Sequence, residues 1–158
     1  MDHDGANHTR LTGFGWGFFG WSPDGSRIVL MGAENAANLW LVNADGGGLS
    51  QLTNSSRSDY EPLKWSPDGS RIAFNSWFTE SQSGLFIINP DGSGLRMLTD
   101  EYGPHGWISW SPDGKWIVFE SNQDVRRRIL VVHVASGAVT MLSPPNGNER
   151  HPEWRKNP

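Results

Sequence analysis

A five-residue motif, Trp-Ser-Pro-Asp-Gly, occurs three times and constrains the fold more than any other feature of this chain. It occupies 21–25, 65–69 and 110–114, so its tryptophans are 44 and 45 residues apart, and a lone Trp154 follows after 44 more. Repeats of this length are typical of architectures in which one small structural unit is copied along the chain. The 158 residues are therefore interpreted first as a series of repeats.

The motif predicts a tight turn between two strands. Proline presets φ for the first central position, and the Asp side chain caps its own backbone. We expect Gly25, Gly69 and Gly114 to have φ > 0, which closes the turn of a hairpin. The tryptophan ends the first strand, and so large a side chain at one position per repeat is expected to be buried between neighbouring repeats.

Three more segments of strand character follow the turn in each repeat. They are a strand of period 2, an apolar strand after a polar loop, and a short strand that ends in Leu-Thr or Leu-Ser. No helical period interrupts them. The expected second strands are 27–30, 71–74 and 116–119, the third are 39–43, 85–89 and 129–133, and the fourth are 49–52, 95–98 and 139–142. Four-stranded antiparallel sheets repeated every 40 to 45 residues or so are characteristic of β-propeller blades, and a stacked β-sandwich is the competing all-β fold.

About three complete blades are expected, which makes the chain a partial propeller. An incomplete ring exposes the faces of its end blades, so we expect a second copy of the chain, or another protein or peptide, to cover them. The predicted organisation is a single domain over 1–158, with blade-like repeats at about 13–53, 54–99 and 100–143, an orphan last strand at 8–12 and the start of a fourth repeat at 144–158.

The repeat resembles that of the TolB-like β-propeller family. The motif, the strand Arg71–Phe74, the turn Asp91-Gly92 and the ending Leu98-Thr99 carry the resemblance, which extends from about Leu11 to Trp154. It implies a periplasmic or other extracytoplasmic location but no single activity. We expect a protein- or peptide-binding module, because no catalytic constellation is visible in the sequence. Similar blades occur in oligogalacturonate lyase and in the propellers of prolyl-oligopeptidase-like and tricorn-like peptidases, so the propeller part of an enzyme is the alternative function.

The sequence contains no motif that indicates a catalytic residue, a cofactor or a metal site. No nucleophile elbow, His-Glu-x-x-His motif or phosphate-binding glycine loop occurs, and there is no cysteine. The turn aspartates lack the carboxylate spacing of a calcium loop, and Arg126–Arg128 is interpreted as a solvated loop tip. A net charge of −4 argues against nucleic acid. No apolar run is long enough for a membrane span, and the first ten residues or so do not resemble a secretory signal.

The candidate ligand-binding residues precede the motif tryptophans and Trp154. In a propeller, the loops that lead to the innermost strands lie at the mouth of the central channel, where exposed aromatic, charged and His side chains contact ligands. Alternatively, the aromatic residues only fill space between blades. The histidines stand at different offsets from their tryptophans, so a shared metal site is not expected. The candidates are Trp16, Tyr60, Glu61, His105, Trp107, Arg150 and His151.

Overall fold

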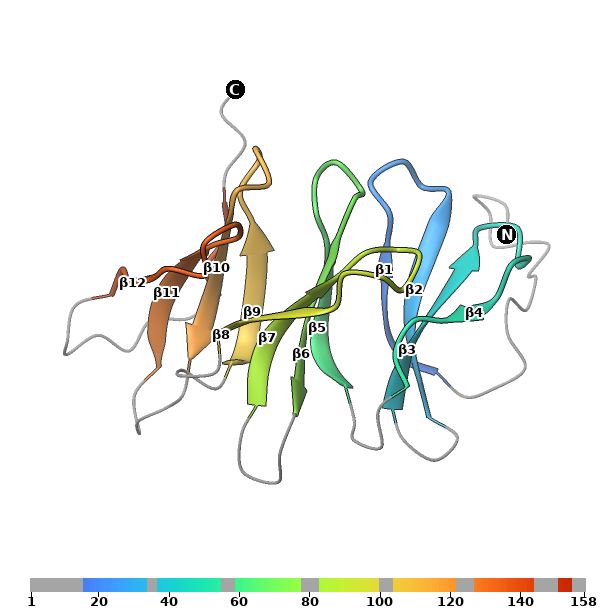
Figure 1. Ribbon diagram of the computed structural model, residues 1–158, viewed down its shortest axis with the longest axis horizontal. Helices are drawn as coiled ribbons and strands as arrows, with labels where there is room; N and C mark the ends of the chain where they lie inside the picture. The colour runs from blue at the N-terminus through green and yellow to red at the C-terminus, as the bar shows by residue number, and fades with distance from the viewer. Residues whose placement is uncertain are drawn as a thin grey trace, which may run out of the picture.

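Three four-stranded antiparallel sheets stand side by side in the computed structural model (Figure 1). It describes residues 16–33, 37–54, 59–77, 83–99, 104–121, 127–143 and 151–154. Within these ranges there is no helix. The predicted all-β fold, a partial β-propeller of four-stranded blades, is confirmed.

The strands of every sheet pair in chain order, so each blade is a meander of hairpins. The first sheet contains β1 (Trp16–Trp21), β2 (Arg27–Ala33), β3 (Ala37–Asn43) and β4 (Ser50–Gln51). The second contains β5 (Asp59–Trp65), β6 (Ile72–Trp77), β7 (Ser83–Ile88) and β8 (Arg96–Thr99). The third contains β9 (Pro104–Trp110), β10 (Trp116–Ser121), β11 (Arg128–His133) and β12 (Val139–Met141). The second and third strands of each blade pair beyond their expected ends, so parts of the predicted polar loops belong to strands.

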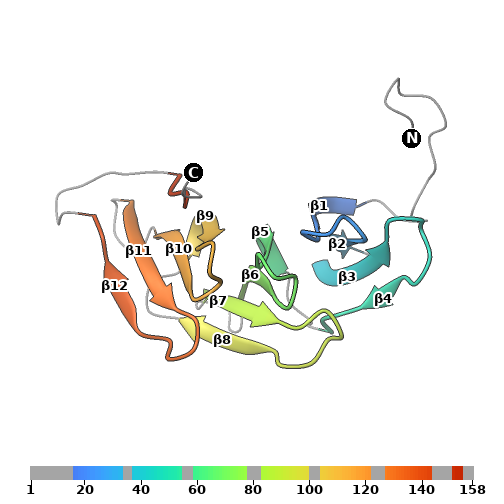
Figure 2. The same cartoon turned by 90° about the horizontal axis from the view of Figure 1, so that it is seen from above.

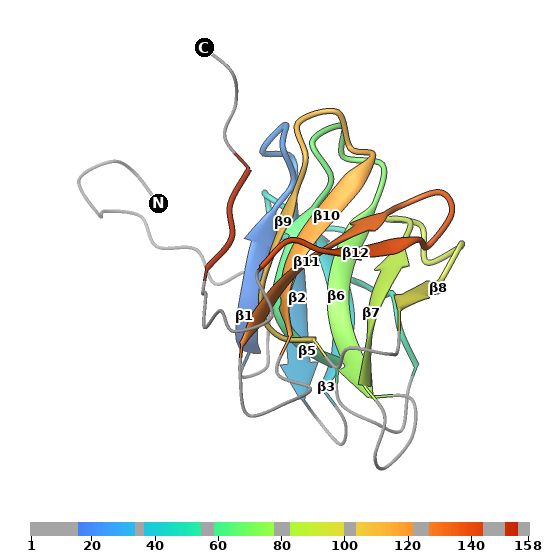
Figure 3. The same ribbon diagram turned by 90° about the vertical axis from the view of Figure 1, so that its left-hand side faces the viewer.

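The sheets form an open arc when seen from above (Figure 2). The first strands, β1, β5 and β9, lie on the concave side, and the last strands, β4, β8 and β12, lie on the convex side. Figure 3, a side view, shows the sheets stacked behind one another. This is the arrangement of neighbouring propeller blades, with the innermost strands facing the central channel.

The Trp-Ser-Pro-Asp-Gly segments form the predicted turns. Gly25, Gly69 and Gly114 have φ of 70°, 71° and 68°, which confirms the expectation from the motif. In the second blade, the Ser66 hydroxyl donates to Asp68 at 2.6 Å and accepts the Arg71 N–H at 2.9 Å. The bond from Ser66 is the main cause that holds the pKa of the Asp68 carboxyl below its usual value. The turn therefore uses its serine and aspartate as a local hydrogen-bonded pair.

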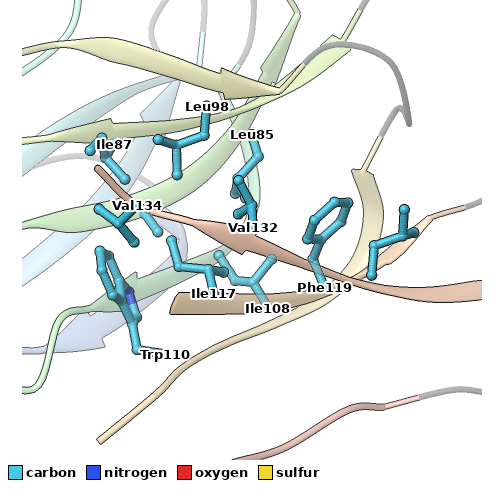
Figure 4. Packing of buried hydrophobic residues seen from close by; sticks show 11 residues of the cluster. Leu85, Ile87, Leu98, Ile108, Trp110, Ile117, Phe119, Val132 and Val134 are labelled. Atoms are coloured by element: carbon cyan, nitrogen blue, oxygen red, sulfur yellow. The ribbon is translucent and has the colours of Figure 1, made fainter. Parts of the chain in front are cut away.

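Apolar side chains from adjacent sheets form the core at each of the two junctions. Figure 4 shows the junction of the second and third sheets, where Leu98 and Trp110 belong to one buried cluster. Leu52 and Trp65 occupy the same roles at the first junction. The Trp65 indole donates from Nε1 to the carbonyl oxygen of Gly20 at 3.0 Å, and Trp110 donates to that of Lys64 at 3.0 Å. Both acceptors directly precede the motif tryptophan of the previous blade.

The ends of the arc lack a neighbouring blade within the described residues. Trp21 is 51% exposed, whereas Trp65 and Trp110 are 8% and 7% exposed. At the other end, Leu142 is 56% exposed. The expected burial of the motif tryptophan is therefore right for Trp65 and Trp110 and wrong for Trp21, because this burial needs a preceding blade. That a second copy or another protein covers the ends stays a prediction.

Replacing a junction tryptophan tests this packing, and Trp21 provides the matched control. Trp65→Ala should lower the free energy of unfolding by about 3–5 kcal/mol, because it removes a buried aromatic side chain and leaves a cavity. Trp21→Ala should lower it by less than about 1 kcal/mol, since much of that side chain is already in water. Urea denaturation followed by circular dichroism measures both. Equal losses would contradict the junction packing described here.

Candidate functional site

A groove of about 460 Å³ lies on the concave side of the arc, where the three innermost strands meet. Its aromatic side chains are unusually open to solvent for their size. Phe18 and Phe19 on β1 are 47% and 65% exposed, and Trp107 on β9 is 50% exposed. The lining residues are Phe18, Phe19, Pro62, Leu63, Lys64, Gly106, Trp107 and Arg127.

Irregular strand pairing brings consecutive residues into this groove. In a regular strand, adjacent side chains point to opposite faces, yet Phe18 and Phe19 both line the groove. The β1–β2 register shifts between Trp16 and Phe19, and the β5–β6 register shifts between Tyr60 and Lys64. Such bulges re-aim side chains next to binding sites. The lining of the groove thus depends on register shifts that interrupt the regular alternation of side chains in β1 and β5.

Lys64 joins the junction to the groove. Its main-chain carbonyl accepts the indole N–H of Trp110, which fixes the backbone of β5 at this residue. Its exposed side chain extends over Trp107, with Nζ 5.9 Å from the centre of the indole ring. A cation over an aromatic face is held by electrostatic attraction to the ring. An ammonium group is therefore positioned beside the largest exposed aromatic side chain of the groove.

A buried carboxylate lies next to the groove. Glu120 on β10 is 0% exposed and forms an ion pair with Arg127. A Cβ added at Gly106 would lie 2.8 Å from the Glu120 Cβ, so the glycine provides the space for this side chain. The prediction that Arg126–Arg128 is a solvated loop tip is wrong for Arg127. This side chain compensates the buried charge of Glu120.

A short extended segment, His151 to Trp154, is bound against β9. The His151 ring lies 4.8 Å from the Trp107 ring, tilted by 59°, and the His151 N–H donates to Glu120 Oε2 at 3.3 Å. The Trp154 N–H donates to Ser109 Oγ at 3.4 Å. His151 has a φ of 55°, an uncommon conformation for a residue with a side chain, and such conformations are found at ligand clamps and other functional sites.

The predicted site residues are only partly brought together by the described structure. Trp107 and His151 are in direct contact. The backbones of Trp16, Tyr60, Glu61 and His105 belong to the innermost strands and not to loops. Their side chains, and the whole of Arg150, lie outside the described residues, so their role stays a prediction.

Eight residues of this region were not among the candidates from the sequence. They are Phe18, Phe19, Pro62, Leu63, Lys64, Gly106, Glu120 and Arg127. One signal was available. Glu120 stands ten residues after its motif tryptophan, where the other repeats have Met31 and Asn75. A charged residue at the end of an otherwise apolar strand marks a buried polar interaction.

Metal-binding clusters and membrane-spanning helices are both absent from the described ranges. No three His, Asp or Glu side chains there come close enough together to hold a metal ion. The described part of the chain also has no helix of the length and apolar character needed to cross a membrane.

No family model matches the chain, but solved structures do. A putative TolB from Agrobacterium tumefaciens is 27% identical with a TM-score of 0.71, over 83% of this chain and 50% of that one. TolB from Acinetobacter baumannii is 19% identical with a TM-score of 0.60, over 84% and 31%. Oligogalacturonate lyase from Vibrio parahaemolyticus is 15% identical with a TM-score of 0.65, over 84% and 42%. The chain has a TolB-like β-propeller fold and spans half or less of these proteins.

A double-mutant cycle tests the contact between Gly106 and Glu120. Gly106→Ala alone should lower the free energy of unfolding by about 1–3 kcal/mol, because its methyl group overlaps the Glu120 side chain. The same change in a Glu120→Gly background should cost much less, since the Cβ, Cγ and Cδ atoms that it would overlap are then all absent. Chemical denaturation of the four proteins measures the coupling. Equal costs in both backgrounds would contradict the contact.

Proposed function

We propose that this chain is a protein- or peptide-binding module, a single partial propeller whose groove between β1, β5 and β9 receives an extended segment of the partner. One observation carries the proposal: the segment from His151 to Trp154, at the start of the predicted fourth repeat, binds against β9, with the His151 ring on Trp107 and its main-chain N–H on Glu120. The exposed aromatic surface of Trp107 is one kind of contact that peptide recognition uses.

The size and lining of the groove support this function. Binding pockets commonly measure about 300–1,000 Å³ and combine apolar walls with a few polar groups, and this groove of about 460 Å³ falls in that range. Its walls are aromatic and aliphatic, and Lys64 and Arg127 supply its charged groups. Exposed aromatic side chains and Arg are also enriched in protein interfaces.

The remaining candidates belong to the proposed site because of their strand positions. Trp16 begins β1, Tyr60 and Glu61 precede the groove residue Pro62 in β5, and His105 precedes Gly106 in β9. Arg150 adjoins His151 in sequence. We propose that the first four residues extend the contact surface along the same three strands, and that Arg150 adds to it beside His151.

Selection from a random peptide library on the immobilised chain tests the proposed function. Peptides should be enriched relative to an unrelated protein. Trp107→Ala should then weaken binding of the best peptide by about tenfold or more, as expected for an aromatic anchor. Leu95→Ala is the matched control, because Leu95 is also exposed, at 55%, but does not line the groove. Fluorescence anisotropy measures the affinities.

Two outcomes would contradict the proposal. One is that no peptide is enriched. The other is that Trp107→Ala and Leu95→Ala bind the selected peptide equally well. Binding of an acidic oligosaccharide that depends on Trp107, without any peptide binding, would favour the lyase-like alternative instead.

A further inference from the structure

The charged residues in the described lining of the groove are both cations, although the chain as a whole is negative. The net charge of the protein is −4, whereas the described residues that line the groove include two cations, Lys64 and Arg127, and no carboxylate. A concave surface of one sign concentrates ligands of the other sign. The charge of the partner segment is therefore constrained by this surface.

The two cations differ in whether a carboxylate of the protein balances their charge. Arg127 is paired with the buried Glu120, so its charge is largely balanced within the protein. Among the described residues, no carboxylate forms an ion pair with Lys64, whose recorded partner is the face of Trp107 at 5.9 Å. An ammonium group carries three hydrogen-bond donors, and those of Lys64 are presented to the groove.

Aromatic walls flank this ammonium group. β5 lies between β1, which carries Phe18 and Phe19, and β9, which carries Trp107 (Figure 2). Charges interact more strongly beside apolar walls than in open water, because the effective dielectric constant is lower there. A carboxylate next to an aromatic or large aliphatic residue would match both the ammonium group of Lys64 and the aromatic walls beside it.

We propose that the partner segment of this groove is an extended acidic peptide in which Asp or Glu adjoins an aromatic or large aliphatic residue, with the carboxylate on Lys64 and the apolar side chain against Trp107 and the two phenylalanines. This inference rests on the proposed function and adds the chemistry of its ligand. Basic segments are disfavoured, because they would place a like charge against Lys64.

A carboxylate beside an aromatic residue also occurs in the segment from His151 to Trp154. This segment contains Glu153 beside Trp154, and it binds next to the groove through His151 and Trp107.

The test uses the same random library and counts the charged residues in the selected peptides. On the wild-type chain, Asp and Glu should be enriched beside aromatic or large aliphatic residues. Lys64→Glu should bind an acidic selected peptide about tenfold more weakly or worse, because it places like charges together. It should also select basic peptides. The main-chain carbonyl that accepts the Trp110 indole is retained in this variant.

Lys115→Glu is the matched control, because it makes the same charge change outside the groove, at a side chain that is 69% exposed and lies 3.8 Å from Asp113. It should leave the affinity for the acidic peptide within about twofold, since exposed charges interact weakly at a distance in salt. Circular dichroism verifies folding, and Lys64→Gln, which should also weaken acidic peptides, replaces Lys64→Glu if that variant is unfolded.

The outcomes separate this inference from the proposed function. Enrichment of neutral or basic peptides on the wild-type chain, or unchanged affinity in both Lys64 variants, would overturn the acidic-peptide inference and leave peptide binding intact. Failure to enrich any peptide would overturn both, as would Trp107-dependent binding of oligogalacturonate in the absence of peptide binding.

Discussion

The hydrogen bond from a motif indole to the carbonyl of the preceding blade determines how the sheets stand relative to one another. Tryptophan combines a large apolar surface with one N–H donor, and a buried donor requires a partner. At both junctions this partner is a main-chain carbonyl on the innermost strand of the previous sheet, at 3.0 Å. The bond therefore sets the position of each innermost strand against the next.

The groove follows from the same constraint. Lys64 accepts the bond from Trp110 through its main chain and extends its ammonium group over Trp107, three residues earlier on β9. The junction thus fixes the backbone positions from which the cation and the aromatic ring extend. Glu120 completes the site by holding Arg127 and the backbone of His151. The packing between blades and the geometry of the concave face therefore both depend on Lys64.

The features that local chemistry determines were predictable from the sequence. The Pro-Asp-Gly turns and the alternating strands depend on near neighbours, so the repeat predicted them. The exposure of Trp21 was not predictable in this way, because it depends on whether a blade precedes it. The alternation of side chains along a strand also did not predict that Phe18 and Phe19 both line the groove, because this depends on a register shift in β1. The pairing of Glu120 with Arg127 requires the closure of a hairpin that the motif does not describe.

Hydrogen exchange of the indole N–H groups, followed by ¹⁵N NMR, tests the central claim most directly. The indoles of Trp65 and Trp110 are bonded across the junctions and buried, so they should exchange slowly, at rates set by opening of the sheets. The exposed Trp21 should exchange far faster. Similar rates for all three tryptophans would show that the indole bonds do not hold the blades together.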